Sequence, residues 1–351
     1  MRLDEFRYDL PANLIAQQPI KPRHCSRLMI TRRNDKSISN YHFYDLPDFL
    51  DSGDVLVINN TRVIHAVLNG KKIGGGNIQI KMVSRKDLHT WDCIVETLRE
   101  IKPNDEIIFG NNEMVGRVIK RNWCDTGWII EFSSENISID EVLDKYGKLF
   151  IPLHLPQSMT DEEDYQTVYA AEKGSLQPPT GGMHFTYKLF ESLKQKGVKI
   201  VEITQHVGRL DNRLPIDNIE SHEMYEEYYN VTPEAAEIIN SSRKNGHKII
   251  GVGTTVTRTL ETVVDDNGII HPGTGWTKTY IYPGFKFRAI DVLITNFQSP
   301  GITTLILACA FGGTELIMQA YNEAVIRKYH FLEYGDSPVS YTHLDVYKRQ
   351  I

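Results

Sequence analysis

The stretch 177-QPPTGGMHFT-186 places a histidine and two threonines directly beside a run of prolines and glycines. Prolines favour a turn, and the adjacent glycines allow backbone conformations or close approaches that other residues resist. Because an imidazole titrates near neutral pH, the histidine could act as a general acid or base. A tight turn followed by a helix cap explains the same residues without any chemistry. The candidates in this stretch are Gly181, Gly182, His184 and Thr186.

A second stretch, 248-KIIGVGTTVTRTLE-261, has the pattern of a strand, a Gly-x-Gly turn and a helix. In α/β folds, ligands collect where strands end and helices begin, because free N–H groups and the helix dipole point there. The stretch lacks a complete G-x-G-x-x-G fingerprint, so a tight turn with helix caps stays the alternative. Its candidates are Gly253, Thr254, Thr255 and Arg258.

Two further histidines, His206 and His222, fall in loop-like or strand-end contexts, where an imidazole could serve as an acid or a base. Nearby, 220-ESHEMYEEYY-229 combines glutamates with tyrosines. A carboxylate and a stacked ring could hold a purine-like base there. An acidic helix face with tyrosines in the core is the other interpretation.

Alternating helices and strands must position these candidates. Thr186 can cap a helix over 187–196, and Thr232 can cap a second one that begins with a proline. Further strands are expected at 28–31, 54–59, 198–207, 248–252, 279–282 and 292–296, and further helices near 255–264 and from Thr303 onward. This alternation predicts an α/β domain with a largely buried sheet.

Residues 64–147 do not show this alternation of helices and strands. Instead, short β-type runs recur there between turn residues. The runs are 63–68, 78–83, 91–97, 105–109, 114–120 and 128–132. Such spacing predicts a small barrel or a sandwich, inserted into a discontinuous α/β domain of residues 1–63 plus 148–336. Residues 337–351 do not continue the hydrophobic periodicity of a helix or a strand, and we expect them to form a disordered or foreign tail.

Composition excludes several classes of protein. The four cysteines are scattered, without a C-x-x-C pair or a histidine at metal-ligand spacing, which indicates a reducing cytoplasm and no metal site. The longest apolar stretch, 303–311, is too short to cross a bilayer. A net charge of −6 argues against a general nucleic-acid binder. We expect a cytoplasmic monomer without a membrane span.

A set of longer strings runs along the chain up to about Asp336. These strings are 8-YDLPANLIAQQP-19, 26-SRL-28, 53-GDVLVINNTRVI-64, 165-YQTVYA-170, 178-PPTGGMHFT-186, 206-HVG-208, 251-GVGTTVTRTLE-261, 295-TNFQSPGITTLIL-307 and 330-HFLEYGD-336. In this order and at these distances, the chain resembles the S-adenosylmethionine:tRNA ribosyltransferase-isomerases of queuosine biosynthesis.

The resemblance implies a tRNA-modifying enzyme with S-adenosylmethionine as its co-substrate. Its ribosyl part would be transferred to the 7-aminomethyl-7-deazaguanine wobble base of tRNA and rearranged, giving epoxyqueuosine-tRNA, adenine and methionine. The sulfonium acidifies the neighbouring ribose carbon, and general-base help is worth about 10²–10⁴ in rate. The implied architecture is a large mixed-sheet α/β domain that carries an inserted small β-barrel.

The resemblance also suggests roles for single residues. Catalysis is expected at His184, His206 and Thr186. S-Adenosylmethionine is expected at Thr180, Gly181, Gly182, Gly253, Thr254, Thr255 and Arg258, with the arginine suited to the methionine carboxylate by a paired hydrogen bond. The deazaguanine or the tRNA is expected at Arg23, Arg27, Arg62, Glu226 and Tyr165.

Some polar loop positions depart from the family pattern. Asn60 stands for the aspartate of Asn-Asp-Thr-Arg, Asp164 for the arginine before Tyr-Gln-Thr-Val-Tyr, Tyr225 for a second histidine of the acidic motif, and Gln298 for the histidine of Asn-Phe-His-Leu-Pro. Because loops carry function, two other hypotheses stand beside the family activity. One is a diverged enzyme acting on another nucleoside or RNA. The other is a catalytically silent protein that binds S-adenosylmethionine or RNA.

Overall fold

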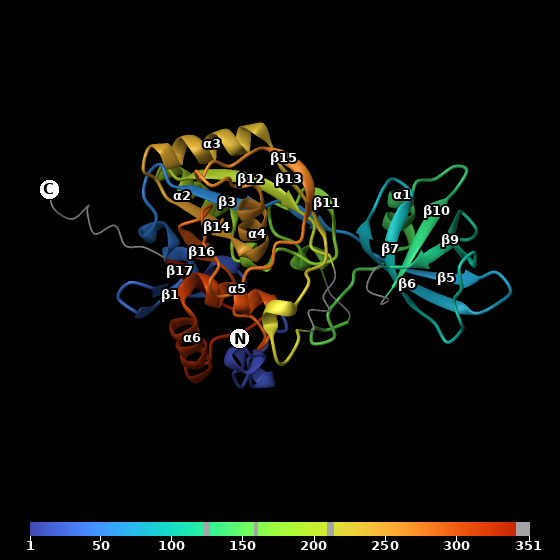
Figure 1. Ribbon diagram of the computed structural model, residues 1–351, viewed down its shortest axis with the longest axis horizontal. Coiled ribbons are helices and arrows are strands. Elements are labelled where there is room, and N and C mark those ends of the chain that lie inside the picture. Colours follow the sequence, from blue (N-terminus) through green and yellow to red (C-terminus); the bar gives the residue numbers. More distant parts are fainter. Residues whose placement is uncertain (123–126, 158–160, 209–213, 342–351) are drawn as a thin grey trace.

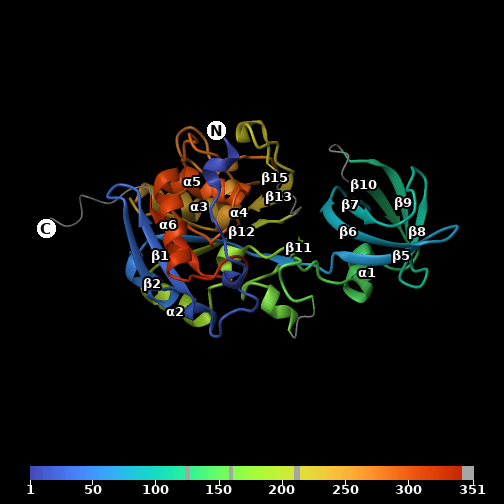
Figure 2. The same cartoon turned by 90° about the horizontal axis from the view of Figure 1, so that it is seen from below.

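The computed structural model describes residues 1–122, 127–157, 161–208 and 214–341. Figure 1 shows a larger part built from helices and strands beside a smaller β barrel, and Figure 2 shows the same separation from a second direction. Within the described residues, the larger part holds a mixed sheet and the smaller part is a closed barrel. The predicted α/β class with an inserted small barrel is confirmed, and a sandwich is excluded.

A nine-stranded sheet forms the centre of the larger part, in the order β15-β13-β12-β3-β14-β16-β17-β1-β2 among the described strands. Its middle, from β12 to β16, is parallel, and both flanks contain antiparallel pairs. In the same order, the strands span Gly273–Thr277, Glu227–Val231, Lys199–Gln205, Val55–Asn59, Ile249–Val252, Val292–Ile294, Ser337–Tyr341, Arg27–Arg32 and Ser37–His42. A short parallel pair, β4 (Thr61–Val63) and β11 (Glu172–Ser175), lies outside this sheet.

Strands β3, β14 and β16 are buried along their whole length and almost entirely apolar, because helices cover both faces of the sheet. Alternate residues of β3 point to opposite sides, so Val55 and Val57 pack in one core and Leu56 and Ile58 in the other. Helix α2 (Tyr187–Gln195) covers the second side. The first side is covered by α3 (Pro233–Lys244), α4 (Gly253–Val263), α5 (Thr303–Gly312) and α6 (Thr314–Ile326).

Two predicted helix caps are confirmed. The side chain of Thr186 accepts a hydrogen bond from the Leu189 N–H at the start of α2, and that of Thr232 accepts one from the Ala235 N–H at the start of α3. Among the described helices, none is by itself long and apolar enough to span a membrane. Only α5 and α6 taken together meet that criterion, and they are bent by 118° at their junction.

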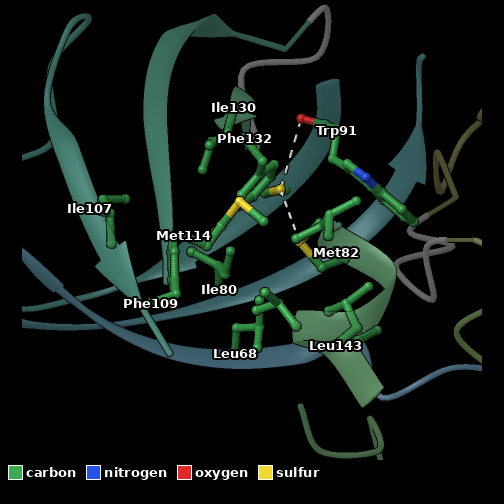
Figure 3. Close-up of a cluster of buried hydrophobic side chains, with 14 of the residues drawn as sticks. Leu68, Ile80, Met82, Trp91, Ile107, Phe109, Met114, Ile130, Phe132 and Leu143 are labelled. Carbon is green, nitrogen blue, oxygen red and sulfur yellow. Dashed lines mark hydrogen bonds between the residues drawn. The ribbon is translucent and has the colours of Figure 1, made fainter. Parts of the chain in front are cut away.

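The barrel closes in the order β10-β7-β6-β5-β8-β9. These strands span Trp128–Ser133, Thr90–Glu96, Asn77–Arg85, Val67–Lys72, Glu106–Phe109 and Met114–Arg121. Figure 3 shows its apolar filling, and Leu143 of α1 (Ile139–Tyr146) packs into the same core. Each such large side chain contributes about 1.5–3 kcal/mol when it is fully buried. All these elements lie within 64–147, and the division of the chain into independent domains stays a prediction.

Three local predictions are wrong. The strand expected at 279–282 lies instead at Gly273–Thr277, and the acidic helix considered for 220–229 is a short 3-10 turn followed by β13. Residues 337–341 are not part of a tail, because β17 is buried between β16 and β1. The serines and the proline of Ser-Pro-Val-Ser-Tyr favour a loop, but pairing with a strand on each side overrides this local preference. The rest of the expected tail, 342–351, lies outside the described residues.

Candidate active site

A cavity of about 610 Å³ lies where the barrel meets the edge of the large sheet. We call it the junction cavity. The barrel contributes residues at the end of β6 and the start of β7, and the sheet contributes the facing ends of β12, β13 and β15. Its lining includes Ser84, Lys86, Trp91, His206, Tyr228 and Trp276.

Aromatic rings form one wall of the junction cavity. The ring of His206 stacks on Tyr228 with centroids 5.1 Å apart and planes 20° apart, and Trp276 meets Tyr228 edge-on at 5.8 Å. The ammonium of Lys86 lies 5.1 Å from the Trp276 ring centroid. Flat aromatic surfaces next to a cation suit a nucleobase.

Glu226, a sequence candidate, lies on the same wall. Its carboxylate pairs with Lys278 at 3.1 Å and with Lys86 at 3.6 Å. Burial by itself raises the pKa of Glu226, but the two ammonium groups outweigh it and hold this pKa below its usual value. The carboxylate is therefore a permanent acceptor at the rim of the cavity.

His206 is fixed by a chain of hydroxyl groups. Its Nδ1 lies 2.8 Å from Thr61 Oγ1, which lies 2.7 Å from Ser175 Oγ, and the Val207 N–H donates to Ser175 Oγ at 2.8 Å. Burial lowers the pKa of His206 to about 4, so the ring is neutral at pH 7. Gly174 makes room for it, since a Cβ there would lie 2.5 Å from the ring.

Behind this wall lies a buried charged network centred on Glu227. Its carboxylate pairs with Arg258 and accepts hydrogen bonds from Gln205 Nε2 at 2.6 Å and from the Gly208 N–H at 3.0 Å. Gln205 in turn accepts one from the Thr259 hydroxyl at 2.6 Å. The network holds two opposite charges out of water with most of their hydrogen-bonding capacity filled.

A second, narrower cavity of about 110 Å³ lies on the other side of Glu227. We call it the helix-end cavity, because residues at the start of α4 and of α5 line it. Glu227 lines both cavities. The sequence candidates Thr254, Thr255 and Arg258 meet here, as predicted for neighbours on one helix start. The remaining lining residues that matter below are Gln177, Tyr280, Thr303 and Thr304.

Residues 178–182, which we call the proline–glycine bend, line neither cavity, whereas Gln177 directly before them lines the helix-end cavity. A Cβ on Gly181 would lie 3.0 Å from the Gly253 backbone, and one on Gly182 would lie 1.8 Å from the Tyr169 hydroxyl oxygen. These glycines are therefore required by packing within the protein. Thr180 starts the single 3-10 turn that contains them. Gly253 opens α4 with a φ of +91°, a value that favours glycine.

His184 is buried, 3% exposed, and its Nδ1 lies 2.9 Å from Ser26 Oγ. Burial lowers its pKa to about 4. It borders a recess of only about 10 Å³, room for one water at most. Thr186, which caps α2, lies 2.7 Å from His24 Nδ1 and lines neither cavity. Of the three predicted catalytic residues, only His206 faces a cavity of substrate size.

The arginines predicted for tRNA are engaged within the protein. Arg23 donates to the backbone carbonyl oxygens of Gln166 and Glu163, and Arg62 pairs with the Glu163 side chain. Arg27 stacks on the Tyr329 ring at 3.5 Å and donates to the Arg327 carbonyl at 2.9 Å. Tyr165 is fully buried and meets Tyr334 edge-on at 6.5 Å. Sequence spacing could not reveal these internal partners.

The departures from the family pattern have partners within the protein. Asn60 accepts a hydrogen bond from Thr204 at 2.8 Å, Asp164 pairs with Lys21 at 2.8 Å, and Gln298 accepts one from Thr304 at 3.0 Å. Only the fourth, Tyr225, lines one of the two cavities, the helix-end cavity. The scaffold accommodates these changes without an evident defect.

Sequence reasoning missed several wall residues. They are Thr61, Ser175, Gln205 and Trp276. Glu227 and Tyr228 belong to the stretch 220–229, whose carboxylates and tyrosines were candidates for a purine-like base. Tyr228, Tyr229 and Val231 are residue types that favour strands, and this signal could have revealed the wall. Within the described ranges, no group of three or more His, Cys, Asp or Glu could hold a metal ion.

Comparison with known proteins gives consistent matches. A sequence model of the family described as queuosine biosynthesis protein matches residues 3–339. S-Adenosylmethionine:tRNA ribosyltransferase-isomerases from Moorella thermoacetica and Caldanaerobacter subterraneus are each 44% identical, over 96% of this chain and 99% of theirs. A crystal structure of S-adenosylmethionine tRNA ribosyltransferase from Thermotoga maritima aligns with a TM-score of 0.55 at 31% identity, over 96% of this chain and 99% of that one.

Proposed function

This chain belongs to the queuosine biosynthesis protein family, and from that premise we propose that it is a tRNA ribosyltransferase-isomerase. It transfers the ribosyl part of S-adenosylmethionine to the 7-aminomethyl-7-deazaguanine wobble base of tRNA and isomerises it. The products are epoxyqueuosine-tRNA, adenine and methionine. The observation that carries this function is the 44% identity over nearly the full length of relatives named for this reaction.

The junction cavity is the proposed reaction chamber. S-Adenosylmethionine supplies the ribosyl group and a sulfonium that acidifies the adjacent ribose C–H. The stacked rings of Tyr228 and His206, with Trp276 beside them, offer flat surfaces for a nucleobase. Glu226, held by Lys86 and Lys278, offers a fixed acceptor for a base N–H.

His206 is the proposed proton acceptor. Val207 N–H donates to Ser175 Oγ, the Ser175 hydroxyl donates to Thr61 Oγ1, and the Thr61 hydroxyl faces the Glu172 carbonyl at 3.4 Å. With the hydroxyls in this order, Thr61 Oγ1 accepts from His206 Nδ1–H, and the Nε2 lone pair is free to take a proton. A neutral ring at pH 7 suits this role.

Other sequence candidates take supporting positions in this proposal. Thr254, Thr255 and Arg258 contact S-adenosylmethionine from the helix-end cavity. Gly181 lets the bend pack against the start of α4, and Gly182 makes room for Tyr169, so both set the position of the bend. His184 and Thr186 stabilise the fold around the bend. The enzyme acts in the cytoplasm, where its tRNA substrate is found.

Adenine release measured by liquid chromatography tests the function. The full chain is incubated with S-adenosylmethionine and tRNA that carries the precursor base, and the nucleoside is identified by mass spectrometry. We expect adenine and epoxyqueuosine together, and neither with tRNA that lacks the precursor. Adenine release with another acceptor would support the diverged enzyme instead. Tight ligand binding without adenine release would support a catalytically silent protein.

A further inference from the structure

Two helix N-termini converge on the helix-end cavity. Helix α4 contributes Thr254 and Thr255 from its first turn, and α5 contributes Thr303 and Thr304 from its first turn. The first N–H groups of a helix have no intrahelical acceptor, and the residues at both N-cap positions, a valine and an isoleucine, have no polar side chain to supply one. Both helix dipoles therefore favour a negative charge here.

Two buried side-chain donors in the same cavity lack a partner. Arg258 uses Nη1 for Glu227 and Nε for the Thr279 carbonyl at 2.9 Å, whereas its Nη2 has no hydrogen-bond partner among the residues that the structure describes. The same holds for the buried hydroxyl of Tyr280. Burial raises the pKa of Tyr280 above its usual value, so this hydroxyl is protonated and can donate at neutral pH.

These donors change the sequence-based expectation for Arg258. A paired hydrogen bond to a carboxylate uses N–H groups on two nitrogens, but Nη1 already donates to Glu227 and Nε to Thr279, so Nη2 is the nitrogen without a described partner. Arg258 Nη2 and the Tyr280 hydroxyl can therefore share an incoming oxyanion. A buried donor without a partner destabilises the folded protein, so an oxyanion bound here removes that cost.

The rest of the cavity has the chemistry of an amino-acid pocket. Glu227 lines the cavity, and its Oε1, which accepts the Gly208 N–H, has a further lone pair for an ammonium group. Apolar side chains of Val207, Met224, Ile281 and Leu307 line the remainder, which suits an unbranched thioether side chain. The volume of about 110 Å³ is too small for a nucleoside and sufficient for an amino acid end.

We propose that the helix-end cavity is an amino-acid subsite that binds free L-methionine as well as the methionyl end of S-adenosylmethionine. The carboxylate lies between Arg258 Nη2, the Tyr280 hydroxyl and the two helix N-termini, and the ammonium faces Glu227. Binding of the methionyl end of S-adenosylmethionine rests on the proposed function, whereas binding of free methionine does not. It follows that methionine, a product, competes with S-adenosylmethionine.

Calorimetry with the full chain and L-methionine alone tests this subsite, without tRNA and without turnover. The key variant is Tyr280→Phe, which removes only a hydroxyl without a described partner and should leave the melting temperature unchanged. We expect it to weaken methionine binding about tenfold, as for a hydrogen bond to a charged group. The matched control is Tyr282→Phe, because Tyr282 packs 5.2 Å from Tyr280 but does not line the cavity. It should bind methionine as the unchanged chain does.

Two further ligands show whether the bound oxyanion is an amino-acid carboxylate or a phosphate. L-Methioninol lacks the carboxylate and should not bind, and inorganic phosphate, a mimic of the tRNA backbone, should not displace methionine. The proposal is overturned if methionine does not bind at about 10 mM, a concentration that detects even millimolar affinity. It is equally overturned if phosphate alone binds in a manner sensitive to Tyr280→Phe. In both cases adenine release with tRNA would still be observed, so the proposed function would stand.

Discussion

The interior of the barrel and the wall of the junction cavity are only a few residues apart along β6 and β7, yet they are built in opposite ways. The barrel interior is apolar, with Ile80, Phe109 and Met114 almost fully buried. Among the described barrel residues, the thiol of Cys93 lies 3.7 Å from the Met82 sulfur, and burial raises the pKa of this thiol so that it stays protonated.

The cavity wall instead holds polar groups, some of which have no hydrogen-bond partner among the described residues. Among the described barrel residues, the buried side-chain atoms without a partner are Ser84 Oγ and Trp91 Nε1, and both residues line the junction cavity. On the sheet side, Arg258 Nη2 and Tyr280 Oη line the helix-end cavity. Within the described part of the barrel, unfilled hydrogen-bonding capacity is therefore kept at the proposed substrate surface, while the apolar core provides stability.

The largest effect is expected at the cavity wall. Replacing His206 with alanine should lower the rate of adenine release about 10²–10⁴-fold, because general-base help of that size is lost. The folded state should persist, since the ring is only partly buried. Single-turnover kinetics with precursor-bearing tRNA measure the rate, and circular dichroism checks the fold. A rate within threefold of the unchanged enzyme would remove His206 from the chemistry.

The barrel core should show the opposite response. Phe109→Ala leaves a cavity under the barrel strands and should lower the free energy of unfolding by about 3–5 kcal/mol. Urea unfolding monitored by tryptophan fluorescence measures the change. At a temperature where the variant is still folded, adenine release should stay close to normal, because the ring lies away from both cavities. Strong loss of activity in a fully folded variant would contradict the separation of the two regions.

The buried histidines should make stability depend on pH. The pKa of His184 is lowered from 6.5 to about 4 in the folded state, so its neutral form is favoured by folding. The resulting stability, about 3 kcal/mol, is present above pH 6.5 and is lost as the pH falls to about 4. Unfolding measured from pH 7.5 to pH 4 should show this loss, and His184→Gln should reduce its slope. An equal slope in both proteins would contradict the assignment.

The smallest effect is expected at the exposed end of the wall. Trp276 is 40% exposed, so Trp276→Ala should barely change stability. Stacking on a base is worth about 1–3 kcal/mol, so the KM for tRNA or for S-adenosylmethionine should rise about fivefold or more. Steady-state kinetics separate KM from kcat. A change in kcat alone would place this ring outside the binding surface.

Much of the architecture could be predicted from the sequence because its signals are local. Thr186 and Thr232 cap the helices that their positions indicate, and the turn residues between 64 and 147 mark the barrel strands. The position of β17 could not be predicted, since Ser-Pro-Val-Ser-Tyr has no strand periodicity of its own. Its pairing depends on partners that are distant in the chain, β1 and β16.

The sequence by itself determined the fold class, the family and the chemical types of side chain at hand, because motifs, caps and hydrophobic periodicity are properties of neighbouring residues. Only the tertiary structure decided which of them share a cavity. It separated His206 from His184, and it brought Glu227 between Arg258 and the junction cavity. It also used the glycines of the bend for packing. The physical reason is that burial, close approach and hydrogen-bond satisfaction depend on contacts between residues far apart in sequence, which no local pattern encodes.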